Sequence, residues 1–367
     1  MPRYKTPILL CLFACFALLT ACTSTSPVAR QALYVSCHQG EHVLVYEIDK
    51  ATGKLAEVQR LEMPGRVGPI ALADDGKHFY AAMRDPSRVM PMTRNTVTGE
   101  LSPLKAAEVP TYPTYLDIDS TGNFAITASY REGVVYTFRI NADGSLDGKP
   151  IQTTNTEKTA HASLIDPSNR FVYIPHTTPN AIYQFRFDDT QGKLQPIQPI
   201  VVKGGGKPSD PAGPRHYTYH PTLGIVYMVN ELDSSVSAYQ WDQRTGRLTR
   251  FQSLTTLPIG FNARNTCADI HVTPNGKFLY ASNRGHDSIA AYKLDEGGLM
   301  TFIDWFKTEE MPREFAIDLN GQYLYAAGLR SHKLAAFSID SGTGRLTRIG
   351  TYDTPEAPIW VEAVELE

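Results

Sequence analysis

The hydrophobic and polar positions of this chain repeat seven times, with a period of roughly 45 to 55 residues. Each unit has an alternating apolar stretch, an Asp-x-x-Gly turn, a second stretch rich in Phe and Tyr, a third that contains an aromatic residue, and a Thr-Gly-x-Leu turn before a fourth. Period-two alternation between glycine turns predicts short β-strands. Four such strands per unit are typical of a propeller blade. We therefore expect an all-β, seven-bladed β-propeller of four-stranded antiparallel blades.

The repeat can be aligned on the residue that opens the turn between the first two strands of a unit. In the second to seventh units this reference residue is Ala73, Asp119, Asp166, His220, Thr273 or Asp318. Around Asp119, residues 115–118 are expected as the innermost strand and residues 124–127 as the second. The expected third strands are residues 43–48, 134–138, 182–187, 236–241, 289–294 and 334–339.

The first unit lacks a sequence for its innermost strand, because it begins at Leu33 with the pattern of a second strand. The last apolar run of the chain, residues 358–364, has the missing pattern. We therefore expect the C-terminal strand to complete the first blade, which closes the ring and removes two exposed sheet edges.

The N-terminus has the pattern of a bacterial lipoprotein signal. Arg3 and Lys5 precede an apolar run of 12 residues, 8–19, which is too short to span a bilayer. Small residues before Cys22 resemble a lipobox, so Cys22 is the expected lipidation site; a simple secretory signal and an uncleaved anchor are the alternatives. The expected divisions are a signal peptide over 1–21, a tether over 22–31 and a propeller over 32–367. No Asp follows Cys22, which indicates an exported protein anchored in the outer membrane and facing the periplasm.

Charge and cysteine content narrow the possible functions. The formal net charge is −3, and removing the signal leaves 33 basic against 38 acidic residues. A mildly acidic chain without basic runs offers no electrostatic basis for nucleic-acid binding, and the N-terminal lipid is the expected contact with a membrane. Cys37 and Cys267 are expected to be buried free thiols, although a disulfide between them is the alternative. No Cys/His spacing typical of a metal site is present, so no metal or organic cofactor is expected.

Two repeat positions carry polar side chains toward one rim of the predicted disc. Because an innermost strand starts beside the end of the next antiparallel strand, both positions face the same opening. Five residues before the reference lie Gly68, Thr114, His161, Arg215, Ala268 and Arg313. Eleven residues after it lie Arg84, Tyr130, Thr177, Glu231, Arg284 and Leu329, with His38 in the first blade.

These residue types suit proton transfer on an anionic substrate. Arginine donates in a fork to a carboxylate, a phosphate or a developing oxyanion, and His161 or Glu231 is a candidate general base. Arg84, Tyr130 and Arg313 are further candidates for substrate binding. Some of these polar residues also have a purely structural interpretation. Arg215 and Glu231 lie on adjacent strands and can form an ion pair, and Asp269 and His271 can brace a turn as satisfied core groups.

Several strings of the sequence resemble the seven-bladed lactonase family, which includes the propeller type of 6-phosphogluconolactonase and a muconate lactonizing enzyme. The resemblance runs from about Ala32 to Val364 and is strongest around four strings: residues 212–216, 227–236, 268–279 and 312–321. It implies a catalytic set of one His, two Arg and one Glu without a cofactor. The matching positions are His161, Arg215, Glu231 and Arg284. Asn283, in the same Ser-Asn-Arg string as Arg284, joins the candidate substrate-binding residues.

The resemblance implies a hydrolase that acts on a sugar lactone in the manner of a 6-phosphogluconolactonase. Export departs from the cytoplasmic members of the family, and it favours a non-phosphorylated gluconolactone as the substrate. Two alternatives remain: a surface-anchored propeller that binds without turnover, and a cyclase that runs lactone chemistry on a muconate in the reverse direction.

Overall fold

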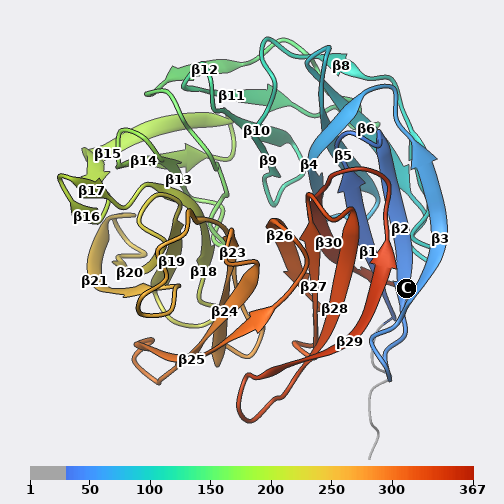
Figure 1. Ribbon diagram of the computed structural model, residues 1–367. Helices are drawn as coiled ribbons and strands as arrows, with labels where there is room; N and C mark the ends of the chain where they lie inside the picture. Colours follow the sequence, from blue (N-terminus) through green and yellow to red (C-terminus); the bar gives the residue numbers. More distant parts are fainter. Residues whose placement is uncertain (1–29) are drawn as a thin grey trace, which may run out of the picture.

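The computed structural model describes residues 30–367, which form seven blades arranged around one axis and one additional two-stranded sheet (Figure 1). This confirms the predicted seven-bladed propeller. The proposed signal peptide, the lipidation site at Cys22 and tether residues 22–29 lie outside the described residues. Arg30 and Gln31, expected as the end of the tether, instead begin the first strand of the propeller. Over residues 30–367 no helix has the length and apolar character needed to span a bilayer.

The blades follow one another along the chain, with the innermost strand of each blade first in sequence after blade one. Blade one contains β30 (Pro358–Leu366), β1 (Arg30–Cys37), β2 (His42–Ile48) and β3 (Leu55–Glu62). Blade two contains β4 (Arg66–Leu72), β5 (His78–Arg84), β6 (Arg88–Arg94) and β7 (Leu101–Pro103), with β8 (Ala107–Glu108) also paired to β6. Blade three contains β9 (Tyr115–Ile118), β10 (Phe124–Ser129), β11 (Val134–Arg139) and β12 (Gln152–Asn155).

Blades five to seven are regular. Blade five contains β18 (Pro214–Tyr219), β19 (Ile225–Asn230), β20 (Ser235–Trp241) and β21 (Leu248–Thr255). Blade six contains β22 (Thr266–Val272), β23 (Phe278–Arg284), β24 (Ser288–Leu294) and β25 (Met300–Lys307). Blade seven contains β26 (Pro312–Ile317), β27 (Tyr323–Gly328), β28 (Lys333–Ile339) and β29 (Leu346–Asp353).

Blade four departs from the expected four strands. Its sheet has three: β13 (Phe171–His176), β14 (Ala181–Asp188) and β15 (Lys193–Lys203). The innermost segment forms only isolated bridges, between Ala160 and His176 and between Ile165 and Val172. A short hairpin of β16 (Gly206–Lys207) and β17 (Asp210–Pro211) then leads into blade five.

The C-terminal strand closes the ring as expected. β30 runs antiparallel to β1, pairing Arg30 with Leu366 at one end and Cys37 with Pro358 at the other. Its buried side chains pack on both sides, into the cores that blade one shares with blade two and with blade seven. The first and last segments of the chain thus form one blade.

A tyrosine in the second strand of most blades explains why the Thr-Gly turn recurs. Its hydroxyl donates to the carbonyl of the turn glycine in the next blade, as Tyr325 does to Gly53 across the closure at 2.9 Å. Five other pairs repeat the contact: Tyr34–Gly99, Tyr80–Gly144, Tyr173–Gly246, Tyr227–Gly298 and Tyr280–Gly344. Each of these glycines has a positive φ, which other residues adopt at a cost. The repeat therefore encodes contacts between blades as well as turns.

Candidate active site

Irregular starts of the innermost strands position the candidate residues. The β18–β19 ladder shifts register between Pro214 and His216, and the β26–β27 ladder shifts between Pro312 and Glu314. Arg215 and Arg313 therefore lie at bulges, where a strand can aim two consecutive side chains inward. The same shift occurs in β22, between Cys267 and Ile270.

A cavity of about 860 Å³ opens on the rim where both repeat positions were expected. The candidates His161, Glu231, Arg284 and Arg313 all line this cavity, as do Arg84 and Tyr130. The two rings therefore share one axial opening, as the repeat spacing predicts.

Glu231, which follows β19, is held between two guanidinium groups. Its Oε1 lies 3.0 Å from Nη2 of Arg284, and its Oε2 lies 3.4 Å from Nε of Arg215. Burial raises the pKa of Glu231, but the charges of Arg215, Arg284 and Arg313 together outweigh it, so the pKa is lowered. Glu231 is therefore an anion that orders its neighbours and holds a proton poorly.

Arg215 lies behind the cavity wall and does not line it. Its side chain is fully buried, and it donates to the carbonyl of Ala268 and contacts the carboxylates of Glu231 and Glu314. The predicted ion pair with Glu231 is therefore present. A buried guanidinium with these partners positions two carboxylates, and its Nε is itself buried beside Glu231.

His161 lies on the cavity wall against the ring of Tyr130, with the two ring centroids 5.4 Å apart. Burial, together with the charge of Arg215 and weaker effects of His216, Arg313 and Arg284, lowers the pKa of His161 well below its usual range. Its Nδ1 is buried without a hydrogen-bond partner among the described residues. His161 is therefore neutral at neutral pH.

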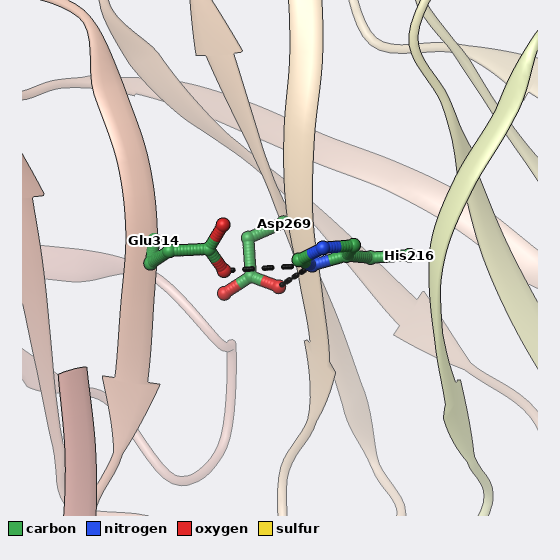
Figure 2. A group of neighbouring side chains, drawn as sticks. All are labelled: His216, Asp269 and Glu314. Atoms are coloured by element: carbon green, nitrogen blue, oxygen red, sulfur yellow. Dashed lines mark hydrogen bonds and ion pairs between the residues drawn. The ribbon is translucent and has the colours of Figure 1, made fainter. Parts of the chain in front are cut away.

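The structure adds a cluster that the sequence argument missed. Nδ1 of His216 lies 3.1 Å from Oδ1 of Asp269 and 3.4 Å from Oε2 of Glu314, and all three side chains are buried (Figure 2). Asp269 was expected as a core group that braces a turn; its Oδ2 does accept from His271 at 2.9 Å. A repeat signal for this cluster existed, since His216, Asp269 and Glu314 each lie four residues before a reference position.

Arg84 and Arg313 line the cavity and, like the exposed Arg131, lack a carboxylate partner within residues 30–367. Arg84 stacks on the ring of Tyr112 at 4.3 Å. Burial lowers the pKa of Arg313 to about 10, and the charges of Arg215 and Arg284 add to this effect. His38 and Tyr112, whose ring centroids are 6.4 Å apart, line the cavity together with both arginines. This part of the cavity carries uncompensated positive charge.

Asn283 lies away from the cavity wall. Its side chain is fully buried, its Nδ2 donates to the Thr256 carbonyl at 3.0 Å, and its Oδ1 accepts from Thr256 and Asn265. These contacts hold the loop before β22. Asn283 therefore does not contact the cavity and can affect the neighbouring Arg284 only indirectly.

Cys37 and Cys267 are buried free thiols, as expected. Burial raises the pKa of each to about 12, which keeps both protonated.

An aromatic floor ends the cavity along the axis. Trp360 of β30 packs edge-on against Tyr115, with ring centroids 5.3 Å apart, and in a tilted arrangement against His216, with ring centroids 5.9 Å apart. Trp360 also lines a second cavity of about 460 Å³ with Asp117 and Glu362. Burial raises the pKa of each of these two carboxyls to about 7. The axial space is thus divided into a cationic chamber and an acidic one.

Comparisons with known proteins agree with this geometry. A family model described as "Lactonase, 7-bladed beta-propeller" matches residues 23–363. A 6-phosphogluconolactonase of Pectobacterium carotovorum is 35% identical over 342 residues, which cover 92% of this chain and 100% of the relative. One of Serratia proteamaculans is 32% identical over 334 residues, which cover 90% of this chain and 98% of the relative.

Solved structures share the fold at lower identity. A periplasmic gluconolactonase of Pseudomonas aeruginosa superimposes with a TM-score of 0.85 at 21% identity, covering 92% of this chain and 100% of that one. A protein from Lactobacillus plantarum superimposes with a TM-score of 0.82, also at 21% identity, with the same coverage.

Proposed function

Because the chain belongs to the seven-bladed β-propeller lactonase family, we propose that it hydrolyses a sugar lactone that carries an anionic group, as a 6-phosphogluconolactonase-like enzyme. The observation that carries the proposal is the charge distribution of the cavity. Arg215 and Arg284 are compensated by Glu231 and Glu314, whereas Arg84 and Arg313 are not.

The reaction needs a group that takes a proton from water and donors that stabilise the oxyanion. Arg284 and Arg313 line the cavity and can donate to the oxygen that gains charge when water attacks the lactone carbonyl. His161, Glu231 and Glu314 are among the side chains on the wall that can exchange a proton. Arg215 fits a positioning role, because it holds Glu231 and Glu314 from behind.

The substrate's anionic group fits the region around Arg84. Guanidinium groups bind phosphate or carboxylate in a fork, and two that lack partners attract an anion from solvent. This favours a phosphorylated or carboxylated lactone over neutral gluconolactone, although the expected export of the chain favours the neutral one.

Protein lacking residues 1–22 is expected to hydrolyse 6-phosphogluconolactone, and Glu231→Gln is expected to lower kcat/KM by about 100-fold or more. The substitution removes the charge that orders Arg284. Hydrolysis is followed by NMR below pH 7, where spontaneous opening is slow. Glu132→Gln, at the exposed cavity mouth, is the matched control. Wild-type rates in Glu231→Gln would remove its role, and a protein that binds lactones without opening any would support the non-catalytic alternative.

Arg84→Gln is expected to lower kcat/KM for 6-phosphogluconolactone by about 10- to 100-fold, because one hydrogen-bonded charge contact contributes roughly 1.5–3 kcal/mol. The value for neutral gluconolactone should change by less than about threefold, since no anion is then bound. Steady-state kinetics on both lactones measures the difference. Equal losses on the two substrates would place the anionic group elsewhere.

A further inference from the structure

Glu231 and His161, the two candidate bases named from the sequence, both line the cavity but are poorly suited to accepting a proton. The two oxygens of Glu231 each face a guanidinium, and their charges hold its pKa low. His161 is surrounded by positive groups that oppose its protonation. A base must accept a proton readily near the working pH, so neither environment favours that step.

Glu314 has a different environment. It lines the cavity, and its only ion pair with a guanidinium among the described residues is with Arg215 at 3.5 Å, whereas Glu231 also has a 3.0 Å contact with Arg284. Its second oxygen, Oε2, faces Nδ1 of His216, which can itself donate or accept a proton (Figure 2). Glu314 therefore combines access to the ligand with a neighbour that can exchange protons.

His216 is held in turn by groups on two other strands. Its Nδ1 also contacts Oδ1 of Asp269, and Oδ2 of Asp269 accepts from Nε2 of His271 and from the backbone N–H of Phe315. Its ring is fixed edge-on against Tyr115 and lies 5.0 Å from the ring of His161. Asp269 and Glu314 each use one carboxylate oxygen to contact another partner, which is His271 and Phe315 for Asp269 and Arg215 for Glu314. These contacts fix the other oxygen of each carboxylate in its position facing His216.

We propose that Glu314 is the general base of the lactone hydrolysis and that His216 and Asp269 are positioning residues that orient its carboxylate. The assignment rests on the proposed function. Water attacks the lactone carbonyl, a C–O bond forms, and Oε2 of Glu314 takes the proton of the water. The tetrahedral intermediate then breaks the ring C–O bond, and Glu314 returns the proton to the ring oxygen, which leaves a hydroxy acid.

The same three side chains also have the donor types of a divalent-metal site, and their ligand atoms lie within 4.8 Å of one another. Three nearby guanidinium groups oppose a cation there. Arg215 contacts Glu314, while Arg284 and Arg313 line the approach through the cavity. Proton exchange is therefore the use that the surrounding charges favour.

The test compares kcat against pH for wild type, Glu314→Gln, Glu231→Gln and His216→Gln on 6-phosphogluconolactone. We expect Glu314→Gln to lower kcat by about 10²- to 10⁴-fold with KM within about threefold, and to remove the fall in kcat toward acid pH. His216→Gln should move the midpoint of that fall, and Glu231→Gln should retain it. Formate should partly restore kcat to Glu314→Ala, which a structural role would not allow.

Glu362→Gln is the matched control, because Glu362 is a half-buried carboxyl that lines the second cavity and not the first, and its substitution should leave kcat unchanged. Thermal melts establish that each variant is folded. A Glu314→Gln enzyme with wild-type kcat, or with an unchanged acid limb, would overturn the assignment while leaving the lactonase proposal intact. Stoichiometric metal in the wild type that is lost in Glu314→Gln would also overturn it. A wild type that opens no lactone would overturn the proposed function itself.

Discussion

Deletion of residues 358–367 is expected to prevent the protein from folding at 25 °C. The deletion removes β30, the innermost strand of blade one, which pairs with β1 along its length. Val361, Val364 and Leu366 are buried in the cores shared with blades seven and two. At roughly 1.5–3 kcal/mol for each side chain, their loss costs about 5–9 kcal/mol, against a total stability of about 5–15 kcal/mol for a typical domain.

The deletion also weakens the closure of the ring, because β1 becomes an unpaired edge and the packing of β30 between blades one and seven is lost. A chain that ends at Leu366 is the control, since it loses only the exposed Glu367. Circular dichroism melts and size-exclusion chromatography distinguish the two. A monomeric truncated protein with a cooperative melt near that of the control would show that closure by β30 is dispensable.

The propeller architecture could be predicted from the sequence because the same residue types recur at the same positions of each repeat and make the same structural contacts. The turn-opening Asp119 accepts from the backbone N–H groups of Asn123 and Phe124, and Asp318 accepts in the same way from Gln322 and Tyr323. One residue type at one spacing thus produces the same turn in different blades. The incomplete innermost strand of blade four was missed, since residues 162–165 keep the apolar pattern but form few ladder contacts.

The repeat spacing also predicted which rim of the propeller holds the site. It did not predict whether each side chain lines the cavity or lies behind its wall. Alternation assigns one inward residue to each step of a strand, whereas the bulges at Arg215 and Arg313 turn two consecutive side chains inward. For this reason Arg215 was expected on the wall and lies behind it, while Glu314 was not considered and lines the cavity. Alternation also explains why Asn283 does not reach the cavity. Successive side chains of a strand point to opposite faces, so Asn283 points away from the side of Arg284 and into the packed layer.

The repeat arithmetic also could not show which charges cancel. Arg84 and Arg284 occupy the same repeat position on the rim, but of these two only Arg284 has a carboxylate partner in the described chain. Pairing depends on side-chain reach across neighbouring blades, which no single unit of the repeat contains.

Arg215→Met is expected to destabilise the protein by about 3–5 kcal/mol at pH 7, because removal of one partner leaves buried charge uncompensated. Arg215 is fully buried and is the contact shared by Glu231 and Glu314. Urea unfolding measures the loss. The double variant Arg215→Met/Glu314→Gln should recover part of the lost unfolding free energy, because one of the two carboxylates left without Arg215 is then neutral.

The pH dependence of this loss separates charge from packing. In the wild type the pKa of Glu231 is lowered, so its pairing stabilises the fold above the unfolded pKa of about 4.3 and is lost as the pH falls through the folded value. Without Arg215, burial should raise the pKa of Glu231, and protonation should then relieve the buried charge. The difference in unfolding free energy between wild type and Arg215→Met should therefore be largest above pH 6 and shrink toward pH 4. A difference that stays constant from pH 8 to pH 4 would mean that Arg215 stabilises the blade by packing alone, and the charge assignment of the whole cavity would then lose its support.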